Sequence, residues 1–110
     1  MTFRPAEFAI EVQPQAEATQ VRVRGELDMA TVAELHAVLR AQQERGRSVL
    51  LDLSQVSFMD SSGLRLLMQA QAHANRDGWN LSLHPDVTEI VSRLLDVTGV
   101  RSSFCWRPHD

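Results

Sequence analysis

The stretch that decides the fold is Val49-Leu50-Leu51-Asp52-Leu53, which is followed a few residues later by Asp60-Ser61-Ser62-Gly63. The first run is short and nearly continuous in apolar side chains, which is typical of a central strand buried on both faces for most of its length. The second run is rich in residues that begin helices, and helical spacing of apolar residues follows it as far as Asp77-Gly78. The sequence therefore predicts a strand that passes directly into a helix near Asp60.

Elements on either side of this junction complete a small α/β pattern. Alternating apolar and polar residues predict strands with one wet face at 8–12, 21–24 and 81–83. Helical spacing marks 32–45 and 87–98 as further helices, and the apolar stretch 104–106 offers a closing edge strand. Because helical crossovers between parallel strands are right-handed, this order predicts a small mixed β-sheet of about four or five strands with helices packed on one face.

Composition limits the classes of protein to consider. With 110 residues and 44% hydrophobic content, the chain is expected to form a single domain over 1–110, with its core at about 8–106. A net charge of -3 and scattered basic residues argue against a nucleic-acid partner. A lone Cys105 and the lack of metal-ligand spacing predict no disulfide, metal or cofactor. Without a signal core or a long apolar run, we expect a cytoplasmic protein with no direct membrane insertion.

The junction residues themselves have two interpretations from the sequence. In the first, Asp60 is an ordinary N-cap, Ser61 and Ser62 fill the first turn with exposed hydroxyls, and Gly63 lets another backbone come close. In the second, one serine is a catalytic nucleophile, but the chain lacks the Gly-x-Ser-x-Gly elbow and has no histidine nearby in sequence. The four histidines belong to different predicted elements: His36, His73, His84 and His109. We therefore expect no enzymatic activity.

Four blocks of the sequence carry a resemblance to a known family. They are Gly25-Glu26-Leu27-Asp28, Val49-Leu50-Leu51-Asp52-Leu53-Ser54, Phe58-Met59-Asp60-Ser61-Ser62-Gly63-Leu64 and Leu95-Asp96-Val97-Thr98-Gly99-Val100. Together they resemble the STAS domain, and in particular its bacterial anti-sigma factor antagonist branch, from about Phe8 to Val100. The first and third blocks, about thirty residues apart, form a specific pair, whereas either alone would be weak.

This resemblance implies a partner-switching function. In that family the unphosphorylated domain binds an anti-sigma factor that is also a serine kinase, and so frees a sigma factor. The serine after the aspartate, here Ser61, is the implied phosphorylation site, with Ser62 as second choice, and a PP2C-type phosphatase reverses the reaction. The residues implied in partner binding are Asp28, Met59, Asp60, Ser62 and Gly63. We expect the phosphate to change the docking surface and not the fold, because a helix N-terminus tolerates negative charge.

Several alternatives stay open at this level. Asp28 could instead be an N-cap, with Thr31-x-x-Glu34 as a competing capping box, and Met59 could be core. The third helix could be capped by Asp86 or by Thr88. Many antagonists carry a further helix where this chain has Pro108-His109-Asp110. The alternative function is a STAS regulatory subunit of a transporter of the lipid-import ATPase type, without a phosphorylation switch; a serine hydrolase using Ser61 is the third hypothesis.

Overall fold

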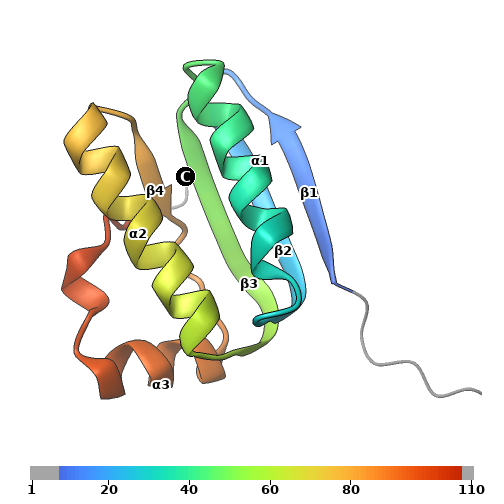
Figure 1. Cartoon of the computed structure of the whole chain (residues 1–110), viewed down its shortest axis with the longest axis vertical. Helices are drawn as coiled ribbons and strands as arrows, with labels where there is room; N and C mark the ends of the chain where they lie inside the picture. Colours follow the sequence, from blue (N-terminus) through green and yellow to red (C-terminus); the bar gives the residue numbers. More distant parts are fainter. Residues whose placement is uncertain (1–7, 108–110) are drawn as a thin grey trace, which may run out of the picture.

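Four strands form one mixed sheet in the order β1-β2-β3-β4 (Figure 1). The computed structural model describes residues 8–107, so Pro108-His109-Asp110 lies outside the described residues. The strands are β1 (Ala9–Pro14), β2 (Thr19–Leu27), β3 (Val49–Met59) and β4 (Leu81–Leu83). The helices are α1 (Val32–Glu44), α2 (Ser61–Asp77), α3 (Glu89–Thr98) and the short 3-10 helix η1 (Arg101–Ser103).

The sheet has the mixed topology that the sequence predicts. β1 pairs with β2 antiparallel, whereas β2 with β3 and β3 with β4 are parallel. β3 runs past the predicted apolar core and ends at Met59, which places Asp60 directly after the strand and Ser61 at the start of α2. The predicted closing strand at 104–106 is reduced to a single bridge between Leu83 and Trp106.

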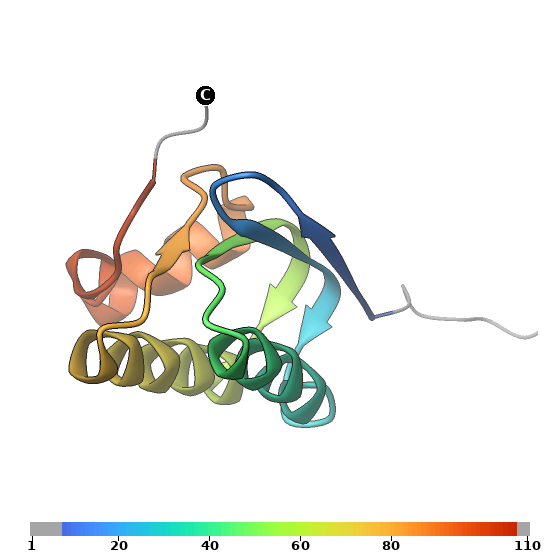
Figure 2. The same ribbon diagram turned by 90° about the horizontal axis from the view of Figure 1, so that it is seen from above.

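The helices cover the sheet unequally. α1 and α2 lie side by side along one face, as Figure 2 shows. α3 packs against β3 and runs crosswise at the end of the molecule where β2 and β3 finish (Figure 1). Apolar side chains from the strands and from all three helices meet in one core, in which the fully enclosed members include Val21, Val23, Leu27, Leu35, Leu51, Leu53, Val56, Val91 and Leu95.

The structure decides between the two residues that the sequence allows as N-cap of α3. Thr88, not Asp86, occupies the N-cap position, yet its side chain makes no capping hydrogen bond. Its hydroxyl instead donates to the Val56 carbonyl of β3 at 2.7 Å. Thr88 therefore ties the beginning of α3 to the central strand.

A buried carboxylate links the central strand to its neighbour. Asp52 is 4% exposed, and it accepts hydrogen bonds from the Arg22 guanidinium at 3.2 Å and from the Ser54 N–H at 2.8 Å. Burial by itself raises the pKa of the Asp52 carboxyl, but hydrogen bonds from Ser54 and Arg22, with the charge of His84, bring the net pKa below its ordinary value. The Asp52 carboxylate is thus kept ionised, and its bond to Arg22 links β3 to β2.

Candidate functional site

The two sequence blocks about thirty residues apart meet because β2 and β3 are parallel and end together. Leu27 pairs with Met59 in the register, so Asp28 and Asp60 are the next residues along two adjacent strands. Neighbouring strands lie about 4.8 Å apart, and the Asp60 N–H donates to the Leu27 carbonyl at 3.4 Å. The loop after β2 and the start of α2 therefore form one continuous surface.

Asp60 caps α2 as the sequence predicts. Its backbone is extended, and its Oδ1 accepts from the N–H groups of Ser62 at 2.8 Å and Gly63 at 3.1 Å. These are charge-assisted bonds at the positive end of a 17-residue helix, so the carboxylate stabilises the first turn. The cap fixes the position of Ser61, which lies between Asp60 and the two donors.

The two serines differ in their exposure. Ser61 is exposed at the first position of α2, whereas Ser62 is half-buried. Within residues 8–107, no histidine is hydrogen-bonded to either hydroxyl, although His36 of α1 lines the same hollow as Ser62. The described part of the chain therefore gives the serine hydrolase hypothesis no nucleophile–base pair.

Gly63 and Met59 lie beneath the surface that the serines present. A Cβ atom placed on Gly63 would stand 2.7 Å from the Leu27 carbonyl oxygen and 2.7 Å from the Met59 Cγ. The backbone that approaches Gly63 thus belongs to this chain's own β2. Met59 is 4% exposed, so its side chain packs in the core. The predicted roles of both residues in partner binding stay predictions.

Asp28 organises the loop that lies beside Asp60. Its Oδ1 accepts from the Ala30 N–H at 3.0 Å, and its own N–H donates to the Thr31 hydroxyl at 2.9 Å. α1 begins at Val32 with Thr31 in the N-cap position, but neither Asp28 nor a Thr31-Glu34 capping box provides a side-chain cap. Asp28 therefore shapes the loop, and its carboxylate is only half-buried.

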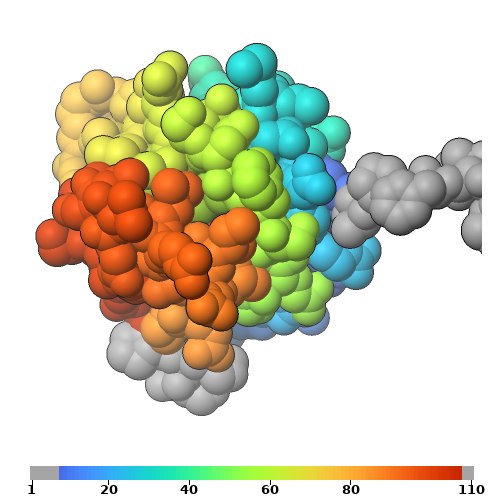
Figure 3. Space-filling model, turned by 90° about the horizontal axis from the view of Figure 1, so that it is seen from below, coloured from blue at the N-terminus to red at the C-terminus, as the bar shows by residue number. Residues whose placement is uncertain are grey.

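Two apolar side chains at this end of the molecule were missed by the sequence analysis. Met29 is 79% exposed next to Asp28, and Phe58 is 41% exposed one residue before Met59. Figure 3 shows that the β3–α2 junction lies between the loop after β2 and α3 on this face. The exposure of Phe58 could have been predicted from strand alternation. Successive side chains of a strand point to opposite faces, so a buried Met59 places Phe58 on the other face of β3.

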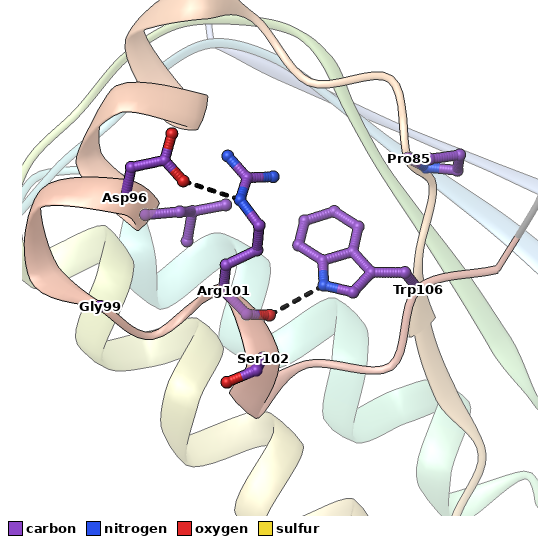
Figure 4. A pocket seen from close by; sticks show the side chains of 7 residues that line it. Pro85, Asp96, Gly99, Arg101, Ser102 and Trp106 are labelled. Carbon is purple, nitrogen blue, oxygen red and sulfur yellow. Dashed lines mark hydrogen bonds and ion pairs between the residues drawn. The ribbon is translucent and has the colours of Figure 1, made fainter.

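A separate hollow lies beside α3 and the C-terminal segment, and it contains none of the predicted site residues (Figure 4). Its wall is built by Arg101, which is ion-paired with Asp96 at 2.8 Å and lies over the Trp106 ring at 5.7 Å. The Trp106 indole N–H donates to the Arg101 carbonyl at 2.8 Å. These contacts attach the segment after α3 to the rest of the fold.

Comparison with known proteins identifies the family. A family model described as "Mlab, STAS domain" matches residues 10–102. This chain belongs to the STAS domain family. Among STAS relatives, an anti-sigma-B factor antagonist of Staphylococcus epidermidis is 38% identical over 93 residues, which cover 84% of this chain and 85% of the relative. A Staphylococcus aureus protein of the same name is 36% identical over the same coverage.

Solved structures of anti-sigma factor antagonists share the fold. An anti-sigma factor antagonist from Mycobacterium paratuberculosis superposes with a TM-score of 0.77 at 22% identity, covering 94% of this chain and 87% of the other. The Bacillus cell fate determinant SpoIIAA in its phosphorylated form gives 0.69 at 19% identity, covering 93% and 92%. In the part of the STAS chain that the structure describes, no helix is long and apolar enough to span a bilayer. Residues 8–107 also hold no cluster of three or more potential metal ligands.

Proposed function

We propose that this STAS protein is an anti-sigma factor antagonist, which binds an anti-sigma factor with serine kinase activity and so releases a sigma factor. Relatives that are 36–38% identical over most of both chains carry the name anti-sigma-B factor antagonist. The observation that carries the proposal is structural: Ser61 is exposed on the surface formed jointly by the Asp28 loop and the Asp60 cap. The relatives' names favour this function over a transporter subunit.

Phosphorylation of Ser61 is the proposed off-switch. The kinase transfers the γ-phosphoryl group of ATP to the Ser61 Oγ, which loses its proton, and ADP leaves. The product adds about -1.5 to -2 charge at pH 7. Asp60 precedes Ser61 and Asp28 follows the adjacent strand, so the phosphate adds negative charge next to two acidic residues. SpoIIAA, whose fold is similar, has been solved in both unphosphorylated and phosphorylated forms.

The Asp60 cap explains why the switch need not alter the fold. The cap bonds go to the N–H groups of Ser62 and Gly63, and neither bond uses the Ser61 side chain. A phosphate on the exposed Ser61 hydroxyl therefore leaves the capping carboxylate in place. Met29 in the loop after β2 and Phe58 near the end of β3 are also exposed, and they add apolar area at the ends of these strands.

The other components of the cycle follow from this proposal. A PP2C-type phosphatase returns Ser61 to its free hydroxyl, the cycle runs in the cytoplasm, and the chain acts by binding without catalysing a reaction. Partner contacts are assigned to Asp28, Asp60 and Ser62 at the surface. Gly63 and Met59 contribute from beneath it, by holding α2 against the end of β2.

Phosphate mapping tests the proposal directly. The protein is incubated with its cognate anti-sigma kinase and ATP, and the modified residue is located by mass spectrometry. We expect phosphate on Ser61, loss of transfer in Ser61→Ala, and retained transfer in the matched control Ser103→Ala, which changes an exposed serine on η1 outside the site. Transfer to Ser62 alone would show that Ser62, and not Ser61, is the phosphorylation site. Absence of both binding and transfer, with binding to a transporter ATPase instead, would favour the transporter function.

A further inference from the structure

Among residues 8–107, one cation that shares hollows with Ser61 and Ser62 has no acidic partner. Arg65 lies on α2 and is exposed. Several arginines in the described part of the chain pair with carboxylates: Arg22, Arg24, Arg76, Arg93, Arg101 and Arg107. Within residues 8–107 no carboxylate lies within ion-pair distance of the Arg65 guanidinium, and no hydrogen bond holds it. Its charge is therefore available to a group that arrives later.

Arg65 follows Ser61 by four residues on α2, which is about one helical turn. Residues four apart on a helix have Cβ atoms about 5–6 Å from each other and form ion pairs. Long helical side chains lean toward the N-terminus, over the preceding turn, which directs Arg65 toward Ser61. Consistent with this direction, Arg65 lines one hollow together with Ser61 and a second hollow together with Ser62.

The groups around Ser61 are acidic or already bonded, apart from Arg65 and from His36 of α1, which lines the hollow that Arg65 shares with Ser62. The Asp60 carboxylate already occupies the N–H groups of Ser62 and Gly63. Asp60 is itself a like charge, and Asp28 follows the adjacent strand. A phosphate on Ser61 would thus be repelled from the strand ends and drawn along α2, where the unpaired guanidinium can form charge-assisted hydrogen bonds with it.

We propose that Arg65 is a positioning residue that binds the phosphate of phosphoserine 61 across the first turn of α2 and stabilises its dianionic form. This inference rests on the proposed function, since it concerns the modified state of the same serine. The pair would place the phosphate at the hollow that Ser61 and Arg65 line together. Phosphorylation then changes the shape of the α2 surface as well as its charge.

The test uses protein in which phosphoserine is installed at position 61 during translation, so no kinase is needed. The second pKa of the phosphate is measured by phosphorus NMR titration at low salt, in the wild type and in Arg65→Gln. Because Arg65 favours the dianion, we expect that pKa to be about 0.5 higher in Arg65→Gln, a roughly threefold change in the proton-binding constant. The difference should shrink in 1 M salt, and Arg65→Lys should restore part of it.

Arg40→Gln is the matched control, because Arg40 is an exposed arginine on the neighbouring helix α1. We expect it to leave the phosphate pKa unchanged. Equal pKa values in the wild type and Arg65→Gln, or equal shifts in both variants, would overturn the inference. Failure of a kinase to modify Ser61 would refute the proposed function and leave this titration unaffected, so the two failures are distinguishable.

Discussion

Replacing Gly63 by alanine tests whether close packing beneath the serines holds the site together. At an open helical position this change stabilises a protein by about 0.5–1 kcal/mol, because alanine is the better helix former. Here the new Cβ would stand 2.7 Å from the Leu27 carbonyl oxygen and 2.7 Å from the Met59 Cγ. The methionine can move its flexible side chain, but the carbonyl can move only if the end of β2 shifts.

Overpacking of this kind typically costs about 1–3 kcal/mol, which outweighs the gain in helix propensity. We expect a net loss of about 1–2 kcal/mol in the free energy of unfolding, equivalent to roughly 5–10 °C in Tm for a domain of this size. Urea denaturation followed by circular dichroism measures the loss. Ser62→Ala, at a half-buried neighbour in the same turn, is the control and should change stability by less than about 0.5 kcal/mol. A Gly63→Ala variant as stable as the wild type would refute the packing argument.

Three further substitutions test hydrogen bonds that stabilise the start of α2, the start of α3 and the β2–β3 pair. Asp60→Ala removes both cap bonds and should lower stability by about 1–2 kcal/mol in urea unfolding, whereas Asp60→Asn, which keeps an acceptor, should lose less. Thr88→Val removes the donor to the Val56 carbonyl and should cost about 1 kcal/mol; an unchanged midpoint would count against that contact. Asp52→Asn should cost about 2 kcal/mol at pH 7. Because the folded pKa of Asp52 is lowered, its stabilisation is present above the unfolded pKa of about 3.9 and is lost as pH falls through the folded value. The difference between wild type and Asp52→Asn should therefore shrink below about pH 4, and a gap that widens there would contradict the assignment.

Periodicity and capping chemistry were sufficient to predict the sheet, the three main helices and the Asp60 cap. These features are local: a buried strand needs an apolar run, and a helix start needs an acceptor for its free N–H groups. The prediction of a closing strand at 104–106 was only partly right, because tertiary contacts decide how this segment packs. The segment meets Leu83 through a single bridge, while Trp106 is engaged by Arg101.

The site was predicted less completely than the fold. That Asp28 and Asp60 lie on adjacent strand ends required the parallel register of β2 and β3, which no local pattern reveals. Met59 was expected to be core or a contact residue, and only the packing under Gly63 decides that its side chain is enclosed. The exposure of Met29, and the lack of a carboxylate partner for Arg65 among residues 8–107, depend on which side chains surround them, so they too emerge only from the folded chain.

The most direct test of the account compares two forms of the same protein for binding to the cognate anti-sigma kinase. Unmodified protein and protein carrying phosphoserine at position 61 are titrated into the kinase by isothermal calorimetry. A partner acid within ~4 Å of the phosphate would cost between about 1 kcal/mol in water and about 4 kcal/mol at an effective dielectric near 20. Since each 1.4 kcal/mol is tenfold in affinity, we expect the phosphorylated form to bind roughly fivefold to 700-fold more weakly. Equal or tighter binding by the phosphorylated form would contradict Ser61 as the switch.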